Sequence, residues 1–411
     1  MHGRPDELSR PALSERGLTF LLAAIAAIGP ISLGIYMPVL PLARADFHVS
    51  VAAASGTVTA ALVAYAVGLY AYGPLSDRYG RRPIILTGLL VYLTGVMIAW
   101  FATSVGLLTT GRVVSALGTS AGVTVARATL GDLYAREHMA LRLATITMVM
   151  ALANALSPAL GGVLGDLLGW RVVFAIQAVL AIVIGASAWR WLPETRAPQA
   201  GTDSQSLVGA SMQLTRDRAF LGYALQTGVL YAIFFVFVSL VPYLFRHMGR
   251  TSTEYGAWYI LISLSYFFGN WYTTRNSFRL GLERLITYGI ALQTIGALFG
   301  VLFALAGLWH PSFLFLPWCI IGFAQGLTLP NLTAAGVARA ERHAGAASGL
   351  LGFAQQIIGA GAVQLMANAG TNTPIPLTSF ISITAVAAAA IWWLTPQRVR
   401  MPAGQTVRPG G

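Results

Sequence analysis

One arginine, Arg112, stands deep inside a long apolar run of the chain. Its guanidinium stays charged at physiological pH and therefore cannot carry a proton itself. It can bind an anionic group of a ligand, or it can set the proton affinity of a neighbouring group. The alternative interpretation is a structural hub, in which Arg112 is bonded to serine, asparagine or backbone carbonyl oxygens of neighbouring segments.

The other ionisable residues lie at the ends of the apolar runs or between them, and their pattern argues against catalysis. None of the 14 acids falls at the middle of a run, and the 6 histidines are terminal or in connections. The single cysteine, Cys319, excludes a disulfide framework. We find no metal-ligand cluster and no nucleophile–base pair, so we expect no enzyme, no cofactor and no metal. The acids that a water-filled cavity could reach are Asp46, Asp132, Asp166 and Glu254.

Uncharged polar residues inside the apolar runs are the remaining candidates for ligand contact. Buried amides and hydroxyls can orient a ligand by hydrogen bonds. They also join helices to one another inside a membrane, which is the alternative interpretation of each. With Arg112, the candidate substrate-binding residues are Tyr36, Asn154, Gln226, Tyr231, Asn331 and Gln355.

The elements that position these residues are predicted to be membrane-spanning helices. Of the 411 residues, 56% are hydrophobic and 10% are charged, whereas about a quarter is charged in an average soluble protein. About 20 apolar residues in a helix cross the hydrocarbon core of a bilayer. We therefore expect an all-α integral membrane protein with twelve transmembrane helices in two bundles of six. The runs are 18–41, 53–75, 83–102, 107–127, 143–165, 170–191, 220–245, 256–274, 284–307, 312–336, 345–367 and 376–395.

The longest polar segment, 193–218, divides the chain into halves. We expect a tail at 1–17, a bundle at 18–192, a linker at 193–218, a second bundle at 219–396 and a tail at 397–411. The net charge of +12 comes from arginine alone, placed at run ends, so it indicates orientation rather than nucleic-acid binding. With the amino terminus inside, only Arg44, Arg171, Arg246 and Arg250 face outward. Both tails and the linker are therefore expected in the cytoplasm.

The connection between the second and third runs carries the most specific pattern, from Gly73 to Pro83. Gly73 permits close helix contact, Gly80 permits a tight turn, and Asp77 can cap a helix or pair locally. Three arginines, Arg78, Arg81 and Arg82, would anchor the loop at the inner surface. A hairpin that only sets topology is the alternative interpretation.

This loop resembles the signature loop of the major facilitator superfamily. The segment from Arg112 to Asp132 is similar to the helix-four motif of that family. Ser157, Pro158, Gly161 and Gly162 lie in a segment similar to the antiporter motif of drug exporters, with Ser157 in place of the usual glycine. Gly326, Pro330 and Asn331, together with the segment 344–355, resemble the bicyclomycin/chloramphenicol-resistance branch of the drug/proton antiporters.

The resemblance implies two bundles that open a central site alternately to each side. It also implies that Asp77 closes the cytoplasmic side against the helix that starts near Gly345, with Arg81 and Asp132 completing this latch. The chain departs from the branch at Gly34, where an Asp commonly supplies the proton carrier.

Two functions stay open. The first is proton-driven efflux of small amphipathic drugs or metabolites by a monomer in a bacterial inner membrane. The second is an importer or a dedicated metabolite or anion carrier of the same fold that uses Arg112. A membrane sensor or a membrane-embedded enzyme is disfavoured, because we find no signalling domain and no catalytic arrangement.

Overall fold

The computed structural model describes residues 13–134, 136–196, 209, 211–340, 344–370 and 372–395. Within these ranges the chain folds into helices without strands. The predicted tail 397–411 lies outside the described residues, as do most of the predicted tail 1–17 and the middle of the predicted linker 193–218. The helices are α1 (Glu15–Tyr36), η2 (Met37–Val39), α2 (Leu40–Asp46), α3 (Val51–Tyr79), α4 (Arg81–Trp100), α5 (Val105–Leu133), α6 (Arg136–Leu168), α7 (Val172–Trp191), α9 (Arg218–His247), α10 (Ser252–Leu280), α11 (Leu282–Leu305), α12 (Pro311–Arg339), α13 (Ala344–Ala367) and α14 (Ile375–Leu394).

Eleven spans in the described part of the chain are long and apolar enough to cross a membrane, and α1, η2 and α2 together form the first. The predicted run 256–274 lies in α10, which has 29 residues but falls short of the same apolar standard. Its second half, from 266 to 280, mixes aromatic residues with polar ones such as Asn270, Thr273 and Thr274. The all-helical, multi-pass membrane fold predicted from the apolar runs is confirmed.

Several helices are longer than the apolar runs that predicted them. The run 107–127 becomes α5, Val105–Leu133, and the run 143–165 becomes α6, Arg136–Leu168. Side-chain caps hold the polar ends in helical form, as where the Ser104 hydroxyl accepts a hydrogen bond from the Leu107 N–H at 3.2 Å. The residues just outside these predicted runs, such as 128–133 and 136–142, are therefore part of the helices and not of the loops.

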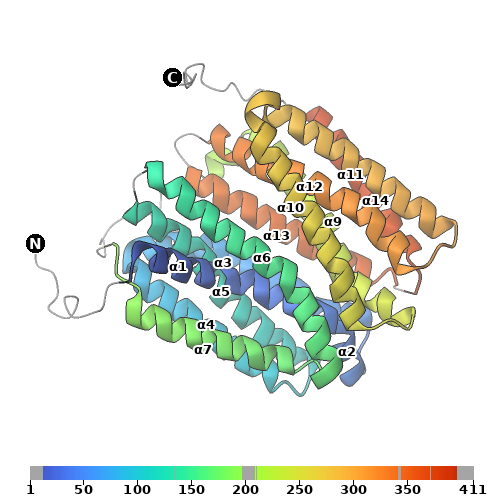
Figure 1. Ribbon diagram of the computed structural model, residues 1–411, viewed down its shortest axis with the longest axis horizontal. Helices are drawn as coiled ribbons and strands as arrows, with labels where there is room; N and C mark the ends of the chain where they lie inside the picture. The colour runs from blue at the N-terminus through green and yellow to red at the C-terminus, as the bar shows by residue number, and fades with distance from the viewer. Residues whose placement is uncertain are drawn as a thin grey trace, which may run out of the picture.

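The helices from α1 to α7 form one bundle and those from α9 to α14 form the other (Figure 1). Inside the first bundle, α4 and α5 approach at backbone distance through glycines. A Cβ built on Gly95 would overlap the backbone of Ser115, and one on Gly118 would overlap the backbone of Tyr92. Small residues allow such close packing, which is a main source of helix association in lipid.

The two bundles touch mainly along α6 with α10 and α3 with α13. We call the end of the molecule where α1 begins and α14 finishes the termini end, and the opposite end the far end. Toward the far end α6 and α10 come together, and toward the termini end they diverge (Figure 1). Along the other side, α3 and α13 stay close, from the Gln364 side chain that donates to the Ala52 carbonyl at 3.3 Å to Leu69 beside Gly352. The helices α6 and α10 are thus in contact toward the far end and farther apart toward the termini end (Figure 1).

Candidate functional site

A carboxylate network holds the signature loop at the termini end. Gly80 has a φ of 96°, a left-handed conformation that favours glycine and turns the chain sharply from α3 into α4. The Glu194 carboxylate accepts hydrogen bonds from the backbone N–H groups of Arg81 and Arg82 at 2.9 and 3.1 Å. It thereby caps α4, where the helix dipole favours negative charge.

Arg81 is the centre of this network. Its guanidinium pairs with Asp77 at 2.9 Å and with Asp132 at 2.8 Å, and it donates to the Ser76 hydroxyl at 2.6 Å. Asp77 also pairs with Arg196 at 2.7 Å. All these partners belong to the first bundle or follow it directly. The structure thus brings together Asp77, Arg81 and Asp132, three residues of the predicted latch.

Among the described residues, the contacts of the Asp77 carboxylate are with Arg81 and Arg196, and none is with the start of α13. A Cβ added at Gly345 would meet no heavy atom within 4 Å. This fits the separation of the bundles at the termini end, and the gating role of Asp77 stays a prediction. Nearby, the Arg82 guanidinium donates to the Trp189 carbonyl at 2.7 Å, and Arg78 lies 5.2 Å from the centroid of the Tyr79 ring. Gly73 packs toward Thr124 of α5.

The far end is closed by backbone contacts of the antiporter-like segment of α6. A Cβ on Gly162 would overlap the Ser252 carbonyl, and one on Gly256 would lie 2.6 Å from the Cα of Ala159. Gly161 makes an equally close contact with the carbonyl of Ile35 on α1. The α6 backbone thus touches both its own bundle and the opposite one, which only glycine permits at these positions.

Gly34 packs directly against Ser157, and this pair explains two departures from the related branch. A Cβ on Gly34 would lie 2.8 Å from the Cβ of Ser157 and 3.4 Å from the Cδ of Pro158. No space is available for an aspartate at residue 34 while residue 157 is serine. The glycine at residue 34 and the serine at residue 157 therefore depend on each other, because the Ser157 side chain occupies the space that a side chain at residue 34 would need.

Asp166, at the far end of α6, binds both helices that face it from the other bundle. Its carboxylate accepts from the backbone N–H and the hydroxyl of Thr253 at 2.7 and 2.8 Å, and it pairs with Arg246 at 3.2 Å. Because α10 begins at Ser252, the carboxylate also lies at the positive end of a helix dipole.

The other acids near run ends are bound within their own bundle. Asp46 pairs with Arg171 at 2.7 Å, and Glu254 lies 3.6 Å from Arg250, which precedes α10 in the connection from α9. Asp132 pairs with Arg81, as described above. Among the described ion pairs, only that of Asp166 with Arg246 joins the two bundles.

Arg112 lies in a hub inside the first bundle, with 3% of its surface exposed. Its Nη1 donates to the carbonyl and hydroxyl of Ser32 at 3.3 and 3.2 Å, and its guanidinium lies 4.5 Å from the centroid of the Tyr36 ring. Ser32 donates to Gln177 at 2.7 Å, and the Tyr36 hydroxyl is 2.9 Å from that of Thr57. In this conformation the surroundings of Arg112 match the structural interpretation, and substrate contact by Arg112 and Tyr36 stays a prediction.

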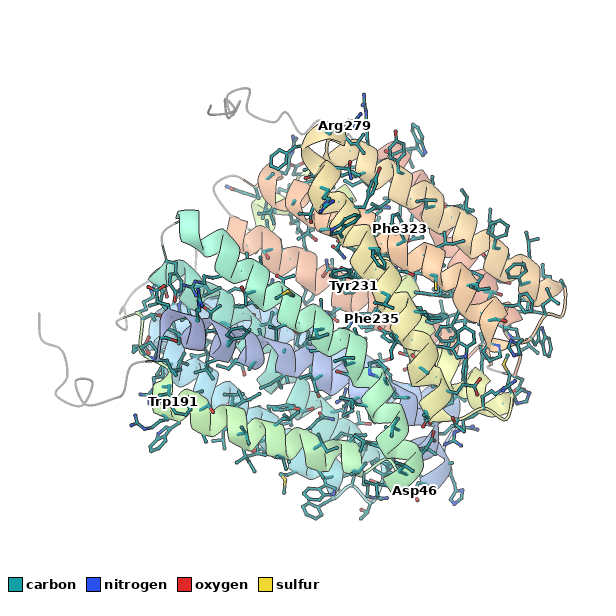
Figure 2. The ribbon with its side chains drawn as sticks, in the orientation of Figure 1. Asp46, Trp191, Tyr231, Phe235, Arg279 and Phe323 are labelled. Atoms are coloured by element: carbon teal, nitrogen blue, oxygen red, sulfur yellow. The ribbon has the colours of Figure 1, made fainter. Side chains whose placement is uncertain are left out.

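Of the other predicted ligand contacts, Asn154 and Tyr231 lie where the two bundles face each other, whereas Gln226, Asn331 and Gln355 belong to helices of the second bundle. Asn154 on α6 interacts with the Tyr259 hydroxyl of α10, and half-buried Tyr231 lies between the bundles (Figure 2). Gln226 is buried, and neither atom of its amide has a partner among the described residues. Asn331 donates to the Leu327 carbonyl of its own helix at 2.7 Å, and Gln355 is half-buried on α13.

Two residues near Tyr231 were missed by sequence reasoning. Arg127 was counted with the loop arginines, yet it lies within α5 and is exposed. Tyr65 of α3 points its hydroxyl toward Gly29 of α1. Both are within electrostatic range of each other, and Arg127 is within range of Tyr231 as well. The predicted run 107–127 ends at Arg127, and a helix-period pattern continued past 127 would have placed Arg127 within the helix rather than at its end.

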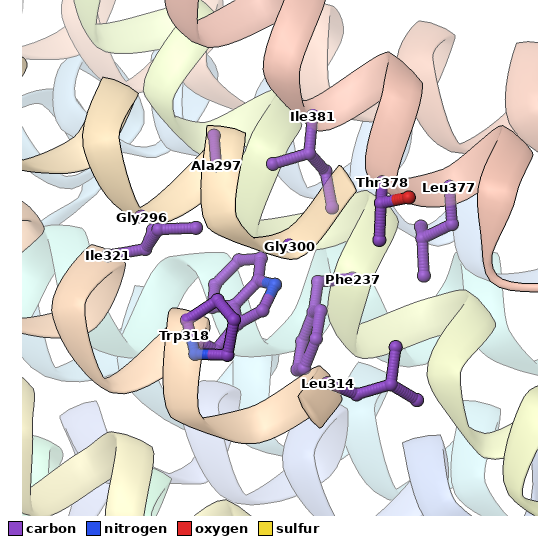
Figure 3. A pocket seen from close by; sticks show the side chains of 11 residues that line it. Phe237, Gly296, Ala297, Gly300, Leu314, Trp318, Ile321, Leu377, Thr378 and Ile381 are labelled. Carbon is purple, nitrogen blue, oxygen red and sulfur yellow. The ribbon is translucent and has the colours of Figure 1, made fainter. Parts of the chain in front are cut away.

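The best-defined small pocket of the described residues is not a transport site. It lies inside the second bundle, among α9, α11, α12 and α14 (Figure 3). The rings of Phe237 and Trp318 line it, with centroids 3.8 Å apart. Its walls are almost entirely apolar and it has room for about one water molecule, which excludes a drug-sized ligand.

The Gly34–Ser157 contact predicts a compensating pair of substitutions. Gly34→Ala should destabilise the protein by about 1–3 kcal/mol through overpacking. The double substitution Gly34→Ala with Ser157→Gly should recover most of that loss, because the space is returned. Thermal unfolding of the four purified proteins measures the coupling. Additive losses would show that residues 34 and 157 do not share this space.

The surroundings of Arg112 predict a stability effect for Arg112→Lys. The substitution keeps the charge but loses the bonds to Ser32 and the stacking on Tyr36, which should cost about 1–3 kcal/mol. Thermal unfolding should shift downward while the folded protein keeps its ligand affinity. Lost affinity at unchanged thermal stability would instead assign Arg112 to the substrate.

Comparison with known proteins agrees with the fold and with the signature loop. The model of the Major Facilitator Superfamily matches residues 22–363. The bicyclomycin resistance protein homolog of Haemophilus influenzae is 24% identical over 387 residues, 92% of this chain and 96% of that protein. Multidrug resistance protein D of Escherichia coli is 27% identical over 350 residues, 83% and 86% of the two chains. The crystal structure of a D-xylose-proton symporter shares the fold, with a TM-score of 0.73 at 16% identity over 92% of this chain and 97% of that one. The predicted resemblance is confirmed: the chain belongs to the Major Facilitator Superfamily and is a transport protein rather than an enzyme.

Proposed function

We propose that this transporter exports small amphipathic drugs or metabolites by alternating access, in exchange for protons, as a monomer in a bacterial inner membrane. The observation that carries the proposal is the backbone closure of α6 on α10 at Gly162 and Gly256, with the termini end separated. A closed far end with diverging helices opposite is one of the two states of alternating access, the one in which a ligand exchanges with the termini side, and the export direction is supported separately.

The termini end is proposed to face the cytoplasm. The arginine-rich signature loop, with Arg78, Arg81 and Arg82, lies there, whereas Arg44, Arg171, Arg246 and Arg250 lie toward the far end. An excess of arginine in connections on one side marks the cytoplasmic side of a membrane protein. Export is further supported by the antiporter-like segment of α6 and by relatives named for resistance to bicyclomycin and to multiple drugs.

Asp166 is proposed as the proton-sensitive group. The helix-one position of the related branch cannot hold an acid here, because Gly34 is packed against Ser157. Asp166 bridges the bundles through Arg246 and Thr253, at the end proposed to face the outside. Arg246, Thr253 and the start of α10 favour the charged carboxylate, so Asp166 is ionised while the far end is closed and takes up an outside proton only after that end has opened. When the far end closes again these contacts re-form, and the proton leaves into the space between the bundles, which is then open toward the termini end.

A dedicated anion carrier of the same fold is the second candidate. The observation that favours it is the exposed side chain of Arg127, which lies on α5 toward the termini end.

The proposal predicts proton-dependent efflux that requires Asp166. Accumulation of antibiotics and dyes is measured in an efflux-deficient bacterium, with and without a protonophore. The wild-type protein should lower accumulation of some compounds, and the protonophore should restore it. Asp166→Asn should lose the response to the protonophore, because an amide cannot take up a proton in this pH range.

Asp46→Asn is the matched control for this experiment. It removes a carboxylate at the same end that pairs with Arg171 inside one bundle, so its efflux should keep the protonophore response. Efflux by Asp166→Asn that still collapses with the protonophore would reject the coupling role. Increased accumulation of a compound by the wild-type protein would reject export.

A further inference from the structure

Arg127 is an exposed charge within a membrane-spanning helix. It lies six residues before the end of α5 at Leu133, and the described acids form their ion pairs with other arginines. An arginine at this depth is tolerated when it faces water or a partner, and such a residue is a functional candidate. Arg112 on the same helix differs in both respects, since it is buried and bonded.

The side chains around Arg127 come from both bundles. Tyr65 of α3 and Tyr231 of α9 are both within electrostatic range of its guanidinium. Tyr266 of α10 lies close to Tyr231 in turn. Because Tyr65 and Tyr231 belong to different bundles, an exposed guanidinium within range of both lies at the boundary between the bundles.

An aromatic wall continues from Tyr231 toward the far end. The Tyr231 ring lies 6.4 Å from Phe234 and 5.6 Å from Phe235, centroid to centroid. Phe235 in turn packs against Gly359 of α13 (Figure 2). Phe234 and Tyr231 are half-buried, so part of this wall stays open to the space between the bundles. Such a surface suits the apolar body of a ligand.

The charges near this wall are unbalanced. Every acid whose side chain the structure describes lies at or beyond a helix end: Glu15, Asp46, Asp77, Asp132, Asp166, Glu194, Asp217, Glu254 and Glu283. Those nearest in sequence on the same helix, such as Asp132, already bind Arg81. A cationic ligand at Tyr231 would meet a guanidinium with no acid to offset it. An anionic ligand would supply the missing partner of Arg127, in the planar geometry that guanidinium favours for carboxylate and sulfonate oxygens.

We propose that the transported compounds are amphipathic anions, with the anionic group bound by Arg127 and the apolar body placed on the wall of Tyr231, Phe234 and Phe235. This rests on the proposed transport function and adds the charge class of its substrate. Arg127 would draw in substrate while the termini end is open.

Binding of three ligands with one body tests the substrate class. The probes are naphthalene carrying a sulfonate, a carboxamide or a trimethylammonium group, and binding to purified protein is followed by tryptophan fluorescence. The wild type should bind the sulfonate tightest. Arg127→Gln should weaken sulfonate binding by roughly 10- to 100-fold and leave carboxamide binding unchanged, the range expected for one charged hydrogen-bonded contact.

Arg275→Gln is the matched control, because Arg275 is also an exposed arginine of a spanning helix but lies 4.4 Å from the ring centroid of Trp271. It should leave all three affinities unchanged. Equal or tighter binding of the trimethylammonium probe to the wild type would overturn the proposal, as would a sulfonate preference that Arg127→Gln does not reduce. Efflux of neutral drugs by Arg127→Gln, measured separately, reports on the transport function alone.

A second measurement needs no ligand. Cysteine is introduced at Phe234 in a Cys319→Ser background, and its reaction with anionic and cationic methanethiosulfonates is timed. Even in water, a charge about 10 Å away changes the ratio of the two rates by roughly fourfold. The ratio of the anionic to the cationic rate should be higher for the cysteine at residue 234 than for a free thiol in solution. Arg127→Gln should bring the ratio back to that of the free thiol. A ratio unaffected by Arg127→Gln would place the guanidinium away from the wall and overturn the proposal.

Discussion

The backbone contact between α6 and α10 is the constraint on which the rest of the structure depends. At Gly162 and Gly256 the two bundles meet without side chains between them, so any added Cβ would push them apart. Close packing of this kind is favourable in lipid only while both surfaces fit. Closure at the far end and separation at the termini end are then two consequences of one contact, because α6 and α10 are rigid helices that cross near it.

Charge placement follows from the same geometry. In a membrane an arginine needs water, an acid or acceptors close by. Arg81 meets Asp77 and Asp132 at the termini end, and Arg246 meets Asp166 across the far end. Arg112 uses Ser32 and the face of Tyr36 instead. Arg127 is exposed and takes part in none of the described ion pairs, so we assign the substrate as its partner.

The sequence was sufficient for the fold but not for the side-chain neighbourhood of the site. Apolar runs and arginine positions reveal spans and their division into halves, since both follow from the thickness and charge rules of a membrane. They do not reveal which face of a helix a residue occupies. The predicted run 107–127 therefore ended at Arg127, although the helix extends to Leu133. The absent acid at Gly34 was visible in the sequence, but its cause, the contact with Ser157, required the packing of α1 on α6.

The most direct test of this account measures both ends of the α6–α10 pair at once. Spin labels are placed at Leu167 and Thr251 near the far end, and at Thr147 and Thr274 toward the termini end, all exposed positions, in a Cys319→Ser background. Distances by pulsed electron resonance are compared between the parent protein and Asp166→Asn. Release of the bridge to Arg246 and Thr253 should lengthen the far-end distance and shorten the termini-end distance. Unchanged distances, or two distances that change in the same direction, would contradict a rocking motion about the contact of Gly162 and Gly256.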